Sequence, residues 1–375
     1  MIRTSVPLKL VIAGEWAVLD PSSSAIVAAV NHRLFCEIES NSRNEIEISL
    51  LDFGITEVSA KYENNELIFN QLLSPETKKY LKIIKFTIES SLFLLNYFKP
   101  FKIRIWSEKP ENFSSHPEIK LELGSSAASV VAIHAAIRAF YDISIEKKKE
   151  KEKLLKLSLL SYFIVQNMKG SGIDIAAVFY GGILLYKRFD SDWVLNKIQT
   201  NLPLELFIEY KWPSLEIKPL PKLSDLQLLL GWTQKSSSTS LLISQMEVFK
   251  INNPSEYNEF ISQISKLVKD LSKAWRKNNK NRVLADIQIN EMYLRRLGEI
   301  SGIPIEIPEL KLLSHIADEL GGAGKLSRGD LGIALCFDEE ISNKILQEWK
   351  KYKIIGSKIA IDYDGLKVES TSKNE

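Results

Sequence analysis

The chain has 375 residues, of which 45% are hydrophobic and 26% charged, and its formal net charge is +2. These values exclude a disordered chain and leave no large basic field, so we expect no nucleic-acid partner; the length suits two domains. No apolar run approaches the roughly 20 residues of a membrane span, and Cys36 and Cys336 show no pairing pattern, so we expect a cytoplasmic protein without a membrane partner.

The first half of the chain mixes strands and helices without a strict βαβ repeat, which is typical of an α+β fold. Period-two alternation and β-branched residues predict strands over 8–13, 26–38, 45–49, 101–106 and 182–189. Apolar residues at helical spacing predict helices over about 78–98, 130–140 and 146–167, followed by a short helix from Ile173.

Prolines at 203, 213, 219 and 221 mark an expected domain boundary, with residues 1–221 before it and 222–368 after it. In the second half the pattern predicts strands over 225–232, 332–337 and 358–363, with helices near Leu241 and over 257–277, 282–299 and 340–351. The polar residues 369–375 are expected to form a disordered tail.

A run of small residues opens directly into an apolar helix: Leu123-Gly124-Ser125-Ser126-Ala127-Ala128-Ser129 precedes 130–140. The unpaired amides and positive dipole at a helix N-terminus bind anions, and glycine and alanine let a phosphate approach the main chain. The serine hydroxyls can donate to phosphate oxygens or ligate Mg²⁺. An ordinary helix start with serine caps explains the same residues, so this segment alone leaves both interpretations open.

Three further segments place polar residues next to apolar elements. Lys9 lies in the middle of the first predicted strand, where it must snorkel to solvent, pair with a carboxylate or serve a ligand. Asp174 follows Gly170-Ser171-Gly172 in the first turn of a short helix, where a carboxylate also simply stabilises the helix dipole. Residues 231–240 lead from a strand to a helix through hydroxyls and Lys235, for which a plain N-cap is the alternative.

In this order and spacing the segments resemble the GHMP kinase superfamily, which contains galactokinase, homoserine kinase and mevalonate kinase. The likeness is greatest to the phosphomevalonate kinases of bacteria and fungi, in KLVIAGEWAVLDP (9–21), KGSGIDIA (169–176) and GWTQKSSST (231–239). It covers nearly the whole chain and implies a domain like ribosomal protein S5 domain 2 followed by a ferredoxin-like domain. It also implies phosphoryl transfer from MgATP to (R)-5-phosphomevalonate, giving 5-diphosphomevalonate in the mevalonate pathway of isoprenoid biosynthesis.

The resemblance implies roles for individual residues. Lys9 and Asp174 would face the transferring phosphoryl group, and Ser126 and Gln166 would lie near Mg²⁺. The ATP phosphates would be bound by Lys120, Leu123, Gly124, Ser125, Ser126, Ala127 and Ala128. The phosphorylated substrate would be bound by Lys9, Glu15, Ser171, Gly172, Asp174, Lys235, Thr239 and Arg328.

The acceptor decides what Asp174 has to do. A phosphate monoester has a second pKa of about 6, so it is already a dianion at neutral pH and needs no strong base. Asp174 would then fix Lys9 and shape the acceptor site, while Lys9, Lys120 and Lys235 offset the repulsion between two anions. An alcohol acceptor, as in mevalonate kinase, would instead need Asp174 as a general base, and this sister activity is the first alternative.

Two departures from the family pattern motivate a second alternative, a protein that binds these substrates with impaired turnover. Glu122 replaces the first glycine of the usual Gly-Leu-Gly-Ser-Ser loop, and a carboxylate facing the nucleotide would repel its phosphates. The segment from Lys325 to Gly332 is about three residues shorter than the glycine-rich third motif of the family. A NAD-dependent oxidoreductase is disfavoured, because Gly14 stands without a Gly-x-Gly-x-x-Gly pattern.

Overall fold

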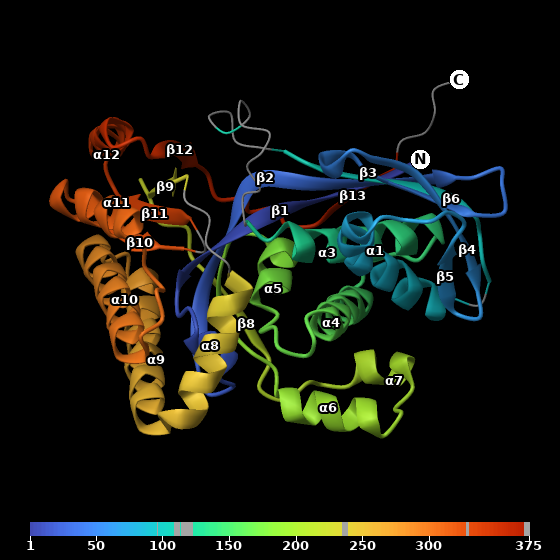
Figure 1. The fold of residues 1–375 in the computed structure, drawn as a ribbon, viewed down its shortest axis with the longest axis horizontal. Helices are drawn as coiled ribbons and strands as arrows, with labels where there is room; N and C mark the ends of the chain where they lie inside the picture. The colour runs from blue at the N-terminus through green and yellow to red at the C-terminus, as the bar shows by residue number, and fades with distance from the viewer. Residues whose placement is uncertain (96, 109–112, 114–122, 235–238, 328–329, 371–375) are drawn as a thin grey trace.

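The computed structural model describes every residue except 96, 109–112, 114–122, 235–238, 328–329 and 371–375. The described elements form two β-sheets, a larger one covered by helices on the face below it in Figure 1 and a smaller one flanked by long helices at the other end. None of the helices in this described part is long and apolar enough to cross a membrane.

The larger sheet is built around two long strands, β1 (Ile2–Ala13) and β2 (Ser24–Ser40), which pair antiparallel along most of their length. Its main path runs β13-β1-β2-β6-β3-β4-β5, and β7 pairs with the first residues of β2 and with β8. The other strands are β3 (Ile46–Leu50), β4 (Ile55–Glu63), β5 (Glu66–Phe69), β6 (Phe101–Ser107), β7 (Ile183–Lys187), β8 (Glu216–Leu220) and β13 (Lys367–Ser370).

Helix α3 (Ser125–Phe140) lies at the centre of this half, because it is apolar on every side and packs on β1 and β2. Around it are α1 (Pro75–Phe93), α4 (Lys148–Val165) and α5 (Ile173–Tyr180), with α6 (Ser191–Gln199) and α7 (Leu204–Glu209) further from the sheet (Figure 1). Short 3₁₀ turns follow β1 at Ala17–Leu19 and β3 at Leu51–Phe53.

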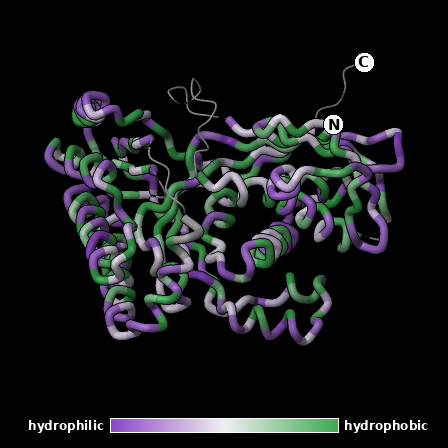
Figure 2. Tube along the Cα trace, in the orientation of Figure 1, coloured by the Kyte–Doolittle hydropathy of each residue, from purple (hydrophilic) through white to green (hydrophobic). Residues whose placement is uncertain are grey.

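The smaller sheet has the strand order β10-β11-β9-β12, and all three pairings are antiparallel. Its strands are β9 (Gln227–Trp232), β10 (Ala323–Leu326), β11 (Leu331–Cys336) and β12 (Ile355–Ile359). Its helices are α8 (Thr239–Asn252), α9 (Pro254–Arg276), α10 (Lys280–Ser301), α11 (Pro308–Glu319) and α12 (Glu339–Lys351). Figure 2 shows hydrophobic and hydrophilic residues alternating along α9 and α10, as expected for helices with one face on a core.

The proline-rich segment at the expected domain boundary contains α7 and the strand β8, whose Pro219 lies on a sheet edge where no amide donor is needed. One expectation about the end of the chain is corrected. The polar tail starts later than expected, because Glu369 and Ser370 belong to β13 and pair with Arg3 and Ile2 of β1. The remaining tail residues, 371–375, lie outside the described part of the chain.

Candidate active site

A buried ion pair joins Lys9 of β1 to Asp174 in the first turn of α5. Lys9 Nζ lies 2.9 Å from Asp174 Oδ1, and the two side chains are only 6% and 13% exposed. Of the three possibilities for a lysine in this strand, the structure shows the carboxylate pair. Asp174 is therefore more than a dipole-stabilising carboxylate, because its charge balances a cation that the strand buries.

The run of small residues lies directly against Lys9. The Lys9 amide donates to the Leu123 carbonyl over 2.8 Å, and Gly124 is the N-cap of α3 with a left-handed φ of 88°. A Cβ on Gly124 would come within 2.9 Å of Lys9 Cε, so only glycine permits this close approach. The N-cap is a glycine, and no side chain among the described residues caps the helix, which makes the serine-cap interpretation wrong. The first-turn amides of Ser125, Ser126 and Ala127 are thus left for another acceptor.

The start of α5 is fixed by packing of the turn before Asp174. Gly172 is its N-cap with φ 81°, and an added Cβ would come within 2.6 Å of Leu159 Cδ2 and 2.9 Å of Tyr186 Oη. Tyr186 Oη donates to the Ser171 carbonyl over 2.6 Å, and burial raises the pKa of Tyr186, which keeps it a donor. Ser171 Oγ accepts from the Ile173 amide. This turn therefore sets the position of Asp174, and the helix start places a second positive dipole end beside Lys9.

Glu15 follows β1 and is held by two residues from the second half of the chain. Its carboxylate forms an ion pair with Lys325 of β10, and its Oε2 accepts a hydrogen bond from Asn290 Nδ2 of α10 at 3.2 Å. Asn290 Oδ1 accepts in turn from the Gly14 amide at 3.1 Å. Sequence reasoning predicted Glu15 but gave no role to Asn290 or Lys325, which carry no local signal of their own.

The shortened loop meets the end of β9. The Thr233 amide and hydroxyl both donate to the Asp330 carbonyl at 3.0 Å, and Trp232 Nε1 donates to the Asp330 carboxylate. On the other side, an ion pair of 2.7 Å from Lys169 to Glu247 of α8 ties this helix to the turn before Asp174. The described start of the predicted motif 231–240 therefore contacts the shortened loop, and the helix that follows the motif contacts the turn before Asp174.

Several predicted residues cannot be placed in this geometry. Lys120, Lys235 and Arg328, together with Glu122, lie outside the described residues, and Thr239 begins α8 without a described side chain. Gln166 is exposed at the C-terminal end of α4. Within the described ranges, no group of three or more His, Cys, Asp or Glu is arranged to hold a metal ion. Mg²⁺ brought with a nucleotide takes most ligands from phosphates and water, so the half-buried Ser126 hydroxyl fits such an ion.

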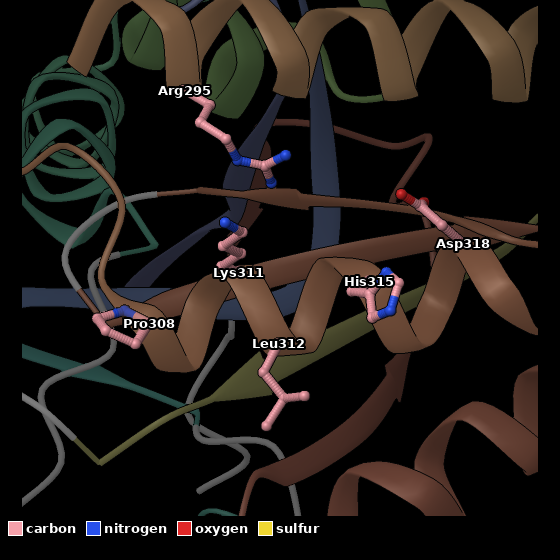
Figure 3. A pocket seen from close by; sticks show the side chains of 6 residues that line it. All are labelled: Arg295, Pro308, Lys311, Leu312, His315 and Asp318. Atoms are coloured by element: carbon pink, nitrogen blue, oxygen red, sulfur yellow. The ribbon is translucent and has the colours of Figure 1, made fainter. Parts of the chain in front are cut away.

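A separate pocket of about 360 Å³ lies between α10 and α11 and shares no lining residue with the site around Lys9 (Figure 3). Arg295 in this pocket binds Glu306 through two hydrogen bonds of 2.7 and 3.0 Å. Behind it, Glu291 is buried and accepts from the Leu326 amide at 3.0 Å. Burial, assisted by the Glu306 carboxyl and opposed by Lys325, raises the pKa of Glu291 to about 8. This shift favours the protonated form of Glu291.

The chain is similar to known proteins over most of its length. Residues 79–182 match the family model of the GHMP kinases N terminal domain. The phosphomevalonate kinase of Streptomyces sp. is 27% identical over 93% of this chain and 93% of that protein. The mevalonate kinase of Saccharolobus solfataricus is 23% identical over 96% of this chain and 98% of that protein.

Solved structures match the fold over the full length as well. The crystal structure of a Lin0012 protein from Listeria innocua has a TM-score of 0.84 and 30% identity, and covers 99% of each chain. The Streptococcus pneumoniae phosphomevalonate kinase in complex with phosphomevalonate and AMPPNP has a TM-score of 0.77 and 22% identity, over 96% of this chain and 100% of that one.

Proposed function

Since the chain belongs to the GHMP kinase superfamily and has its α+β, two-sheet fold, as predicted, we propose that it transfers the γ-phosphoryl group of ATP to (R)-5-phosphomevalonate. The observation that carries this proposal is the ion pair between Lys9 and Asp174, which lies between the N-termini of α3 and α5. Two helix starts and a lysine are suited to two anionic substrates, and a phosphate acceptor that is already ionised needs no strong base.

ATP binds at the start of α3 in this proposal. The amides of Ser125, Ser126 and Ala127 point out of the first turn, and the absence of a side chain at Gly124 lets the Lys9 side chain lie against this helix start. Lys120 is proposed to add a cation to the same phosphates. A magnesium ion bound with the nucleotide would neutralise part of the triphosphate charge, and Ser126 would offer it a hydroxyl ligand. We assign ATP binding to residues 1–221.

The acceptor phosphate lies on the other side of Lys9, toward Ser171, Gly172 and Glu15. One of its oxygens attacks the γ-phosphorus, the new P–O bond forms, and the bond to the β,γ-bridging oxygen breaks to release ADP. Lys9 stabilises the charge on the transferred group, and Asp174 keeps the ammonium in place. Residues 222–368 are proposed to close the acceptor side, through Lys235, Thr239 and Arg328.

Mevalonate kinase is the second candidate, because proteins of that activity also match the chain over nearly its full length. With an alcohol acceptor, Asp174 has to accept the hydroxyl proton in the transition state. The two candidates therefore differ in whether the substrate arrives already ionised.

A coupled assay of ADP release separates the candidates. We expect kcat/KM for phosphomevalonate to exceed that for mevalonate by about 100-fold or more, with homoserine and galactose near background. ³¹P NMR of the product is expected to show a diphosphate, which a phosphorylated alcohol would not give. Faster turnover of mevalonate would establish the second candidate. Binding of ATP by calorimetry without ADP release from any acceptor would identify a binding protein with impaired turnover.

A further inference from the structure

Lys325 is a lysine buried at the junction of the two halves of the chain. It belongs to β10, and its side chain has 0% exposure. Taking an ammonium out of water is strongly unfavourable unless every N–H finds an acceptor and the charge finds a counterion. The groups around this ammonium therefore indicate the role of Lys325.

The three donors of Lys325 are directed at the end of β1. Nζ forms its ion pair with Glu15 Oε1 and donates to the Leu326 carbonyl at 2.6 Å, with the Val11 carbonyl at 3.5 Å. An ammonium has three donors, so these three acceptors saturate it. The ammonium of Lys325 donates all its hydrogen bonds within the protein and is not available to a ligand.

Glu15 is consequently restrained at both carboxylate oxygens by residues distant in sequence. Lys325 holds Oε1, and Asn290 holds Oε2 while also accepting from the Gly14 amide. The segment that follows β1, the strand that carries Lys9, is thereby fixed by α10 and β10. The orientation of Glu15 depends on the second half of the chain.

We propose that Lys325 is a positioning residue for the acceptor site: it neutralises Glu15 and fixes its carboxylate, so that this acidic residue can line a site for an anionic substrate. The proposal rests on the function above, in which the acceptor carries a phosphate. Without the cation, a carboxylate at this place repels a dianion, because both charges lie in a region of low effective dielectric constant.

The test combines two substitutions that remove the charges one at a time and together. Lys325→Met keeps the length of the side chain and leaves Glu15 without its cation. We expect it to raise the KM for phosphomevalonate tenfold or more, with the KM for ATP within about twofold of wild type. The double variant Lys325→Met with Glu15→Gln removes the unpaired charge, and it is expected to recover the acceptor KM to within about threefold of wild type.

A matched control separates this positioning role from a general loss of packing. Glu291→Gln changes a buried polar group that contacts Leu326 beside Lys325, and it imitates the protonated form, so kinetics at pH 7 should stay within about twofold. Glu15→Gln alone is a second test and not a control, because Glu15 lines the proposed acceptor site. It removes the carboxylate charge and leaves the cation in place, so we expect the acceptor KM to fall about twofold or more, which gives a result even if Lys325→Met does not fold.

Each outcome supports or refutes one claim. Absence of phosphomevalonate turnover by the wild type refutes the proposed function. If the wild type turns over phosphomevalonate, three results overturn the positioning role alone. They are an unchanged acceptor KM in Lys325→Met, an equal rise of the KM for both substrates in that variant, and no recovery of the acceptor KM in the double variant. An acceptor KM raised tenfold by Glu15→Gln also overturns it, because the charge of Glu15 would then be needed by the substrate.

Discussion

Two buried ion pairs join a lysine to a carboxylate, one at β1 and one at the segment that follows it, and they differ in the hydrogen bonds that the ammonium can still donate. In the part of the chain that the structure describes, Lys9 Nζ has one partner, Asp174, and lies beside two helix N-termini. Lys325 Nζ has Glu15 and two carbonyl oxygens around it. The first lysine keeps donors for a ligand and the second keeps none. In the proposed function, similar residues at similar burial thus serve a substrate in the case of Lys9 and the fold in the case of Lys325.

The largest effect is expected where the available cation loses its anchor. Asp174→Asn should lower kcat by about 10²-fold or more, because Lys9 is no longer held by a charge against the transferring group. The protein should stay folded at the assay temperature, since the amide fills the same space, but thermal unfolding should shift to a lower temperature because the buried Lys9 ammonium loses its counterion. Steady-state kinetics and circular dichroism check both statements. Activity within a few-fold of wild type would reduce Asp174 to a helix-terminus carboxylate.

The glycines that cap α3 and α5 sharpen the comparison further. Gly172→Ala places a methyl group against Leu159 and Tyr186 in the core, and we expect a loss of about 2–4 kcal/mol in the free energy of unfolding. Gly124→Ala meets only the flexible Lys9 side chain, so it should cost about 1–2 kcal/mol of stability yet displace the ammonium and lower kcat about tenfold. Denaturant unfolding and kinetics on both variants provide the measurement. Equal stability losses would contradict this distinction.

The pH dependence of stability tests the polar cluster behind Lys325. Glu291 has an ordinary pKa of 4.5 when unfolded and about 8 when folded, so between these values the folded protein binds a proton that the unfolded chain has released. Raising the pH through this window therefore destabilises the fold. We expect the free energy of unfolding of the wild type to fall relative to Glu291→Gln by up to about 1.4 kcal/mol per pH unit.

Urea unfolding at several pH values measures this difference. Above about pH 8 the free energy of unfolding should change with pH in the same way for the wild type and for Glu291→Gln, because Glu291 is then ionised in both the folded and the unfolded wild type. Parallel curves between about pH 5 and 8 would show that Glu291 is ionised in the folded protein, and that Lys325 is balanced by two carboxylates and not by Glu15 alone.

The smallest effect is expected at the second contact of Glu15. Asn290→Ala removes the hydrogen bonds to Glu15 Oε2 and the Gly14 amide but leaves the ion pair with Lys325. The acceptor KM should rise about three- to fivefold, less than for Lys325→Met, because an uncharged amide donor stabilises the Glu15 carboxylate less than the buried ammonium does. An effect larger than that of Lys325→Met would assign the positioning of Glu15 mainly to the amide.

The sequence predicted those parts of the site that carry a local signal. Small residues before an apolar helix, a lysine inside a strand and an aspartate after Gly-Ser-Gly are visible within short windows, and the structure brings Gly124, Lys9 and Asp174 together. Asn290 and Lys325 were missed because their roles depend on contacts across 275 and 310 positions. In sequence they are an ordinary helical asparagine and a lysine beside a glycine-poor loop.

The secondary structure that sequence patterns did not predict is mostly short or at sheet edges. β4 and β5 have few buried residues and mix polar with apolar side chains, so their pairing is decided by neighbours and not by alternation. β8 contains a proline, and β13 has only four residues, of which three are polar or charged. β8 and β13 form because β7 and β1 offer sheet edges for them to pair with, and these edges exist only in the folded protein.

The return of the chain to β1 through β13 has a mechanical consequence. The polypeptide leaves the larger sheet after β8 and returns to it shortly before β13. The return is marked by a bridge between Ile361 and Val30 and by a hydrogen bond from the Asp362 amide to the Ala29 carbonyl. Two segments of the chain thus connect the smaller sheet to the larger one, and two connections prevent free rotation of the smaller sheet about either of them. Contacts between the two halves restrict its motion further, because Lys325 and Asn290 bind Glu15 on the segment that directly follows β1. The smaller sheet is thus held to the strand that carries Lys9 by covalent and noncovalent links together.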